Sequence, residues 1–376
     1  MHHSLLQKQI STQPHNTHMN IGILTFHWAT NYGAVLQSYA LQCCLSSMGH
    51  DVEIINYKPK NYDLSLLNIV HNKRYLHPVR YIKECRKEQV ISQFRTSHLH
   101  TTPRCFTTSE IAKIAGKYDM IISGSDQVMN PYFLTYGECK RSSSAYFLGF
   151  PYKGRRMAYA VSFGCTEYPQ EALAMAQRYI EAFGAIGVRE KSGVDIVAQM
   201  GRNDAIVVPD PTALAEKEFY KGIAGRSTKQ HTAPYGYLFF IRNVQDCTAS
   251  LRKVLQGNIH INNNDGDYSV ERWLSNIAHS EYVVTDSFHA TMMALKLNIP
   301  FAVVTHIKGN IEMNDRFYSL LGMLDMTDRM VYKDNLSTIP HIINRPIDWD
   351  TVNSQMARYK QRGIDFLREN LDTTHQ

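Results

Sequence analysis

The strongest constraint on the fold is residues 282–297, where a short strand runs through a polar turn directly into a helix. Ligands of open α/β sheets bind outside the carboxyl ends of the strands, and a helix start adds free N–H groups and positive dipole charge. His289, in the first turn of this helix, can carry a proton near neutral pH. The segment predicts acid–base chemistry on an anionic substrate, and the alternative is that His289 only caps or packs the helix.

Strands and helices alternate along most of the chain, which predicts parallel strands joined by right-handed crossovers. Strands are expected at residues 21–26, 52–57, 118–123, 157–162, 185–188, 205–208, 235–241, 259–261, 282–284 and 301–304. Helices are expected at residues 34–48, 171–183, 192–199, 249–255, 270–278, 288–297 and 352–370. The pattern predicts the α/β class.

The 376 residues are enough for two domains. We expect residues 1–18 to be a disordered leader, with Met19 as the functional start. The remaining boundaries are an N-terminal α/β domain at 19–215 with a basic insertion at 58–106, a linker at 216–234, a C-terminal α/β domain at 235–348, and a C-terminal helix at 349–376. This last helix could pack back on the first domain.

Composition excludes several classes of protein. No apolar run reaches the roughly 18 residues of a membrane span, and the first residues lack a signal-peptide core. The seven cysteines are scattered, odd in number and without a C-x-x-C pair, which disfavours disulfides and zinc and fits a reducing cytoplasm. Paired His and carboxylates at ligand spacing are also missing, so no metal is expected.

The net charge is +6, and much of the excess lies between Lys58 and Arg104. This basic stretch could bind anionic ligands or the anionic inner face of a membrane. The alternative is that it is simply a solvated helical face. No zinc finger or RNA-binding motif accompanies the charge, so nucleic acid is not expected as a partner.

Small polar groups follow several of the expected strands. The turns are Asn31-Tyr32-Gly33, Gly124-Ser125-Asp126-Gln127, Ser162-Phe163-Gly164, Arg189-Glu190, Asp210-Pro211, Asp286-Ser287-Phe288-His289 and Lys308-Gly309-Asn310. One such turn means little, but several at strand ends indicate a ligand cleft between two sheets.

Several of these turns lie in stretches that resemble the polysaccharide pyruvyl transferases. The similar stretches are GILTFHWATNYGAVLQSYALQ (22–42), ISGSDQVMN (122–130), VSFG (161–164), VRE near Arg189, PDPT (209–212), TDSFHATMMA (285–294) and NDRFYSLLGML (314–324). No single motif is specific, but their order is, and they span residues 20–328. Met129 departs from the family pattern, which more often has Trp there.

The resemblance implies two Rossmann-like domains facing across a cleft, as in GT-B glycosyltransferases. It also implies transfer of pyruvate from phosphoenolpyruvate to two hydroxyls of a sugar, which forms a cyclic ketal and releases phosphate without a cofactor. By motif match, the active-site Arg, His and Lys of the family fall on Arg189, His289 and Lys308. The expected setting is exopolysaccharide or capsule synthesis in the cytoplasm, with an acceptor that is lipid-linked, nucleotide-linked or polymeric.

The residue types suit this chemistry. Arg offers a planar fork for a carboxylate or phosphate, Lys offers a point charge, and His can shuttle protons. We expect Arg189 and His289 to be catalytic. Substrate-binding candidates are Lys308, Ser287, Asn31, Gly33, Gly124, Ser125, Asp126 and Gln127.

Each candidate also has a structural alternative. Arg189 could form an ion pair with Glu190 or Asp210, and Lys308 could be an ordinary loop lysine. Asp126 could cap the turn that follows it. Asn31 and Gly33 could shape the first loop or touch the acceptor sugar.

Two other functions remain open from the sequence. A GT-B glycosyltransferase that uses a nucleotide sugar would share the fold and would need a ribose-binding acid, for which Glu271 could be mistaken. A non-catalytic carbohydrate-binding relative is the other, although Arg189, His289 and Lys308 are all present.

Overall fold

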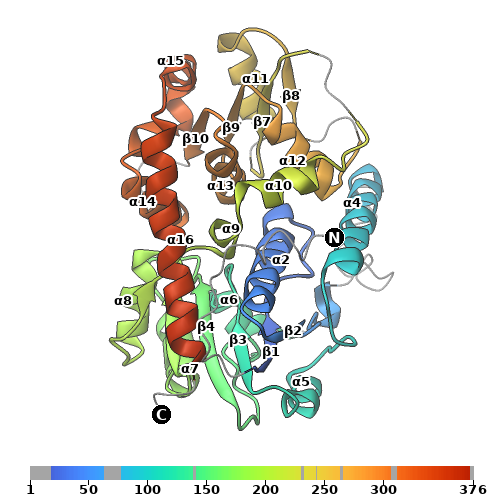
Figure 1. Cartoon of the computed structure of the whole chain (residues 1–376), viewed down its shortest axis with the longest axis vertical. Helices are drawn as coiled ribbons and strands as arrows, with labels where there is room; N and C mark the ends of the chain where they lie inside the picture. The colour runs from blue at the N-terminus through green and yellow to red at the C-terminus, as the bar shows by residue number, and fades with distance from the viewer. Residues whose placement is uncertain are drawn as a thin grey trace. The chain divides into compact units, whose positions relative to one another are not determined.

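The computed structural model describes residues 18–62, 78–138, 141–229, 233–242, 244–262, 266–305 and 311–372. The expected leader, apart from its last residue, and part of the basic insertion lie outside them. The chain forms two compact units (Figure 1). Unit 1 runs to Leu214 and resumes from Gln361 onward, and unit 2 comprises Ala215–Lys360.

Unit 1 is built on a six-stranded parallel sheet in the order β2-β1-β3-β4-β5-β6. Its strands are β1 (Asn20–Leu24), β2 (Asp51–Ile54), β3 (Met120–Ser123), β4 (Arg155–Val161), β5 (Ala185–Val188) and β6 (Ile206–Val207). β1 and β3 are nearly continuous apolar runs, as expected for strands that are covered on both faces.

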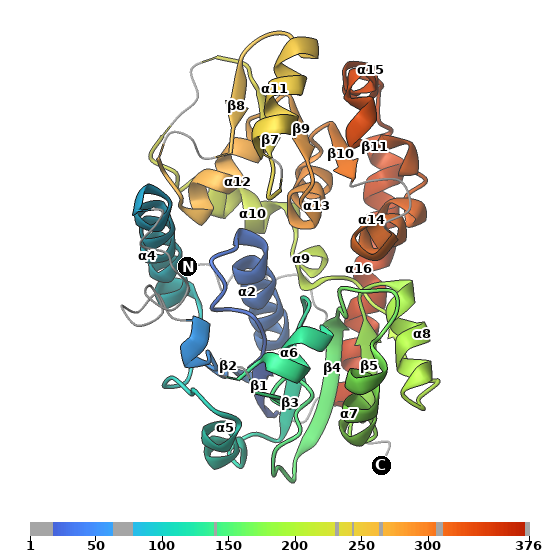
Figure 2. The same ribbon diagram turned by 180° about the vertical axis from the view of Figure 1, so that it is seen from behind.

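Helices cover both faces of this sheet (Figures 1 and 2). One face packs against α5 (Thr108–Ala115), α6 (Pro131–Tyr136), α7 (Gln170–Ile180) and α8 (Lys191–Gln199). The other meets α2 (Tyr32–Ser47), α9 (Pro211–Leu214) and the end of α16 (Trp349–Leu371). The expected basic insertion contains one long helix, α4 (Pro78–His98), which contacts α2. A 3₁₀ turn, Lys60–Tyr62, follows β2.

Unit 2 contains a five-stranded parallel sheet in the order β11-β10-β9-β7-β8. The strands are β7 (Gly236–Phe239), β8 (Ile259–Ile261), β9 (Tyr282–Thr285), β10 (Phe301–Thr305) and β11 (Met330–Tyr332). The helices are α10 (Lys217–Ala224), α11 (Val244–Val254), α12 (Val270–Ala278), α13 (Phe288–Leu297), α14 (Ile311–Met323) and α15 (Ile339–Asn344), with 3₁₀ turns at Thr327–Arg329 and Lys333–Thr338.

The expected linker contains a helix, and the last helix belongs to both units. Residues 217–224, which we expected within a linker, form α10, because Tyr220 and Ile223 are fully buried where α10 packs on α12 and α13. The last helix, α16, crosses from unit 2 into unit 1. The ring of Phe366 lies 6.0 Å from that of Tyr159, and Arg155 donates to the Leu371 carbonyl.

Candidate active site

Arg189 lies just after β5 and is the centre of a buried ionic cluster in unit 1. Its side chain is 1% exposed, and its Nη1 donates to Asp210 Oδ2 at 3.1 Å. Asp126 and Glu190 stand 3.7 and 3.5 Å from its other nitrogens. Burial alone would lower the pKa of the guanidinium, but the three carboxylates outweigh it and raise that pKa. Arg189 therefore forms the ion pairs that the structural alternative expected.

Hydrogen bonds tie this cluster to three strand ends. Ser125 Oγ donates to Asp210 Oδ2 at 3.0 Å, so Ser125 and Arg189 share one carboxylate oxygen. The other oxygen of Asp210 accepts from the backbone N–H and the hydroxyl of Thr212. Glu190 Oε1 accepts from the Phe163 N–H. Buried charges of this kind are stable only when each is paired and hydrogen-bonded, so the cluster fixes the strand ends relative to one another.

The turn after β3 has a strained conformation at Asp126. Its φ is +77°, a left-handed value that is uncommon for residues other than glycine. Its side chain accepts from the Gln127 N–H at 2.9 Å, so it caps the turn as well as facing Arg189. Gly124 permits the turn, since a Cβ there would lie 2.9 Å from the Cβ of Thr25.

An irregularity in β4 faces the same cluster. Ala160 has a φ of +49°, and the register with β5 shifts between Ala158 and Val161. Beyond the shift, the Val161 carbonyl accepts from the Arg189 N–H at 3.0 Å. Bulges are common next to active sites, and this one lies where β4 pairs with the backbone of Arg189.

His289 is in the first turn of α13, in unit 2, as the sequence predicted. The residue is 7% exposed, and its ring meets that of Phe288 edge-on at 5.4 Å. Ser287 caps the helix, with its hydroxyl accepting from the Ala290 N–H, while its own N–H donates to Thr285 Oγ1. A buried imidazole at the start of a helix, after the carboxyl end of β9, suits a group that exchanges protons with a bound anion.

The residues around this helix start bind neighbouring loops. Asp286 accepts from the N–H groups of Ile241 and Arg242, at 2.7 and 2.9 Å. Asn262, with a φ of +44°, exchanges two hydrogen bonds with the Phe240 backbone. The ends of β7, β8 and β9 are therefore linked by side chains, and the oxygens of Asp286 are already used by backbone donors.

Asn31 has a defined structural task. It is the N-cap of α2, and its side-chain oxygen accepts from the N–H groups of Gly33 and Ala34 at 2.9 and 3.3 Å. The side chain is exposed and Gly33 is buried. These two residues shape the first loop, which leaves the Asn31 amide nitrogen to face solvent or ligand.

Three further observations concern Lys308, metal ligands and membrane spans. Lys308 lies outside the described residues. Across the described ranges, no group of three or more His, Cys, Asp or Glu could hold a metal ion. Nor does any helix there have the length and apolarity to cross a bilayer.

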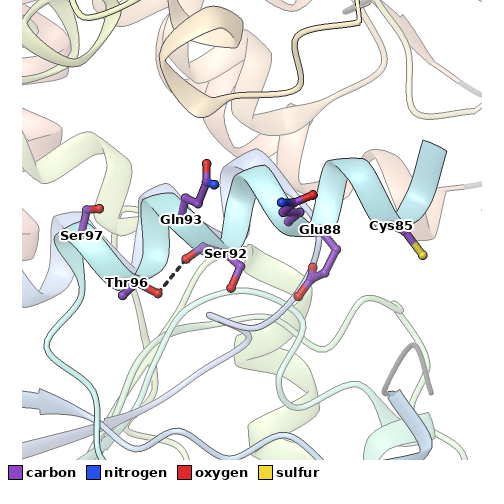
Figure 3. Close-up of a pocket in the computed structure, with 7 residues that line it drawn as sticks. Cys85, Glu88, Ser92, Gln93, Thr96 and Ser97 are labelled. Atoms are coloured by element: carbon purple, nitrogen blue, oxygen red, sulfur yellow. Dashed lines mark hydrogen bonds between the residues drawn. The ribbon is translucent and has the colours of Figure 1, made fainter. Parts of the chain in front are cut away.

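One groove in unit 1 runs along α4 (Figure 3). It encloses about 600 Å³ and is lined by Cys85, Glu88, Gln89, Ser92, Gln93, Thr96 and Ser97. None of the predicted site residues lines it. All of its lining residues belong to α4, and Glu88 also pairs with Arg95, so the groove belongs to the α4 surface and not to the strand-end site.

Solved structures share the fold of this chain. It is the fold of the GT-B glycosyltransferases. The chain superposes on Arabidopsis thaliana UGT89C1 complexed with quercetin with a TM-score of 0.51 and 8% identity, covering 94% of this chain and 100% of that one. The same enzyme with UDP-L-rhamnose gives a TM-score of 0.50 at 8% identity, covering 94% and 99%. At this identity the likeness establishes the fold alone.

The family is more specific than the fold. The polysaccharide pyruvyl transferase family matches residues 31–308, and the chain belongs to this family. No curated protein matches the chain in sequence. The matched range contains Arg189, His289 and all the other candidate residues, which confirms the resemblance recognised from the ordered motifs.

Sequence reasoning missed part of the surroundings of the site. It named Asp210 and Glu190 only as alternative partners of Arg189, and it did not find Asn262. Asn262 carries a weak signal, because asparagine tolerates a left-handed backbone at a strand end. The aromatic residues of α6, within PYFLTY directly after the ISGSDQVMN motif, were also overlooked.

Proposed function

We propose that the protein transfers pyruvate from phosphoenolpyruvate to two hydroxyls of one sugar, in a glycan or glycan precursor, forming a cyclic ketal and releasing phosphate. The observation that carries this proposal is the family match over residues 31–308, which includes both strand-end sites. The proposed reaction uses phosphoenolpyruvate as a substrate and calls for no separate cofactor.

The atom balance of this reaction requires two proton movements. One sugar hydroxyl adds to C2 of phosphoenolpyruvate while C3 gains a proton and becomes a methyl group. The second hydroxyl then adds to C2, the C2–O bond to phosphate breaks, and the phosphate leaves. Of the two hydroxyl protons, one is balanced by the methyl group and one by the phosphate. A single residue that both accepts and donates protons can serve these steps.

We assign that acid–base role to His289. Its position in the first turn of α13 supports the assignment, since the adjoining backbone N–H groups and the helix dipole favour an anionic donor nearby. The Ser287 hydroxyl holds the helix start in place. His289 therefore combines proton transfer with a local environment that suits phosphoenolpyruvate.

We assign Arg189 to the donor site, with Lys308 as a second cation. Arg189 is hydrogen-bonded to Asp210, whereas Asp126 and Glu190 stand farther away, at 3.7 and 3.5 Å. The donor would compete with these two longer contacts while the Asp210 bond keeps the guanidinium oriented. Gly124, Ser125, Asp126 and Gln127 form the turn that fixes this geometry, and Asn31 and Gly33 shape the neighbouring loop.

A cytoplasmic setting is part of the proposal, with peripheral contact at the inner face of the membrane if the acceptor is lipid-linked. The cysteines in the described ranges form no disulfide with one another, which suits a reducing compartment. Exopolysaccharide or capsule synthesis is the corresponding process.

Ligand-dependent stability tests the donor. Phosphoenolpyruvate at 100 times its Kd should stabilise the protein by about 2.7 kcal/mol and raise its melting temperature, while UDP-sugars should not. Titration calorimetry should then show phosphoenolpyruvate affinity falling from wild type to Arg189→Lys to Arg189→Ala, because lysine keeps the charge but loses the fork. A shift with a UDP-sugar but none with phosphoenolpyruvate would instead favour a nucleotide-sugar glycosyltransferase.

A further inference from the structure

An aromatic cluster lies in unit 1 where β1, β2 and β3 end. Phe26 and Trp28 follow β1, Tyr62 follows β2, and Phe133 belongs to α6 after β3. Ring centroids are 4.5 Å apart for Phe26 and Phe133, 4.8 Å for Trp28 and Tyr62, and 6.1 Å for Tyr62 and Phe133. These contacts join three strand-end loops and hold α6 on them.

The outer side of α6 carries two exposed tyrosines. Tyr132 and Tyr136 are 53% and 55% exposed, and their centroids are 6.0 Å apart with an interplanar angle of 35°. Tyr132 also meets Phe133 edge-on at 5.5 Å, so the pair rests on the aromatic cluster. Two large rings left together in solvent are a mark of a binding surface.

Both ends of α6 are fixed. At its start the Asn130 side chain accepts from the Tyr132 N–H at 3.0 Å. After its end, Glu138 accepts from the Thr108 hydroxyl at 2.8 Å and from the Tyr57 hydroxyl at 3.3 Å. The two tyrosines are thus presented by a rigid support, which reduces the entropy lost when a ligand binds.

The chemistry of the pair suits a sugar. The C–H face of a pyranose carries slight positive charge and stacks on the negative face of an aromatic ring, while a phenol hydroxyl can bond to sugar hydroxyls. The ring spacing is comparable to the length of one pyranose residue. Neither tyrosine carries a positive charge, so the pair does not suit the phosphoenolpyruvate donor.

The same turn links this pair to the candidate active site. Asp126, which faces Arg189 at 3.7 Å, precedes Tyr132 by six residues along the turn after β3. The Met129 N–H of that turn donates to the Ser162 carbonyl, and its carbonyl accepts from the Tyr168 hydroxyl. The segment that carries the tyrosine pair therefore also carries Asp126, which faces Arg189.

We propose that Tyr132 and Tyr136 form an acceptor subsite that stacks against a sugar residue of the glycan to be pyruvylated. The inference rests on the proposed function, because that function supplies the glycan acceptor. The subsite would determine which acceptor sugar binds and would not affect the binding of phosphoenolpyruvate.

Kinetics test the subsite in full-length enzyme. The double variant Tyr132→Ala/Tyr136→Ala should raise the KM for the acceptor glycan roughly tenfold. Its KM for phosphoenolpyruvate should stay within about twofold of the wild-type value. The double Phe variant keeps both rings and should stay near wild type. Tyr318→Ala, which removes a 39%-exposed ring from α14, is the matched control and should change neither constant. An unchanged acceptor KM in a folded double Ala variant overturns the subsite.

A second measurement separates this inference from the proposed function. Saturation-transfer NMR without phosphoenolpyruvate would use cellotetraose, chitotetraose and maltotetraose as probes. Wild type and the double Phe variant should saturate the ring C–H protons of at least one probe, and the double Ala variant should not. Binding of this kind without pyruvyl transfer would keep the subsite and reject the reaction. No saturation by wild type, or equal saturation by the double Ala variant, would reject the subsite.

Discussion

At the scale of single residues, the ion pairs of Arg189 should contribute to folding stability, apart from the role proposed for this residue at the donor site. One guanidinium faces three carboxylates in a buried setting, so removing it leaves uncompensated charge. Arg189→Met should lower the free energy of unfolding by about 3–5 kcal/mol. Lys221→Met, which removes an exposed pair with Glu218, should cost below about 1 kcal/mol. Urea denaturation at pH 7 measures both, and equal small losses would mean that the cluster is not structurally important.

His27 predicts a pH dependence of stability. Burial lowers its pKa to about 4, despite hydrogen bonds to Asn56 and Thr25 that act in the opposite direction. The folded state therefore holds it neutral, while the unfolded chain takes up a proton below about pH 6.5. This residue should cost about 3 kcal/mol of stability as pH falls from about 6.5 to about 4.

Comparison with a variant isolates that contribution. In His27→Gln the decline in unfolding free energy over this pH range should be smaller by that amount, whereas His341→Gln, which alters an exposed histidine, should follow wild type. Parallel curves for wild type and His27→Gln would show that His27 is not held neutral.

At the scale of elements, the sequence predicts single strands and helices more completely than it predicts contacts between distant segments. The strand at 185–188 and the helix at 270–278 match β5 and α12, because apolar runs and turn residues are visible in short windows. The cluster around Arg189 joins turns after β3, β5 and β6, whose adjacency depends on strand order and cannot be read from spacing. The sequence pattern does not predict the helix α10, because its charged residues obscure the short apolar face that is buried.

The cap of α2 gives a test at this scale. Asn31→Ala should destabilise the protein by about 1 kcal/mol, while Asn31→Asp retains a capping oxygen and should cost little. Thermal unfolding checks the stability, and acceptor kinetics of the Asp variant check the amide nitrogen. If the Asp variant is stable but has a raised acceptor KM, Asn31 also contacts the sugar. If both variants lose the same stability, the capping role is wrong.

At the scale of the whole molecule, α16 makes unit 1 discontinuous in sequence. Gly363 of this helix leaves no space for a side chain, since a Cβ there would lie 2.5 Å from Pro209 Cγ and 2.6 Å from the Tyr159 hydroxyl. Gly363→Ala should therefore destabilise the protein by about 1–3 kcal/mol through overpacking, less the gain in helix propensity. Gly322→Ala in α14 meets nothing closer than 4.0 Å and should stabilise by up to about 1 kcal/mol. Calorimetry should show opposite signs, and equal signs would contradict the packing of α16 on unit 1.

Deuterium incorporation tests the proposed pyruvyl transfer and the proposed proton exchange at His289 together. The enzyme is incubated in D₂O with phosphoenolpyruvate and candidate glycans, and the products are analysed by mass spectrometry. We predict a glycan heavier by pyruvic acid less water, one deuterium in its new methyl group, and one phosphate released per ketal. His289→Gln should reduce the rate by at least roughly 10²-fold without a matching loss of melting temperature. A glycan that gains a hexose from a UDP-sugar and no ketal from phosphoenolpyruvate would exclude pyruvyl transfer, and a His289→Gln variant within tenfold of wild type would exclude the acid–base role of His289.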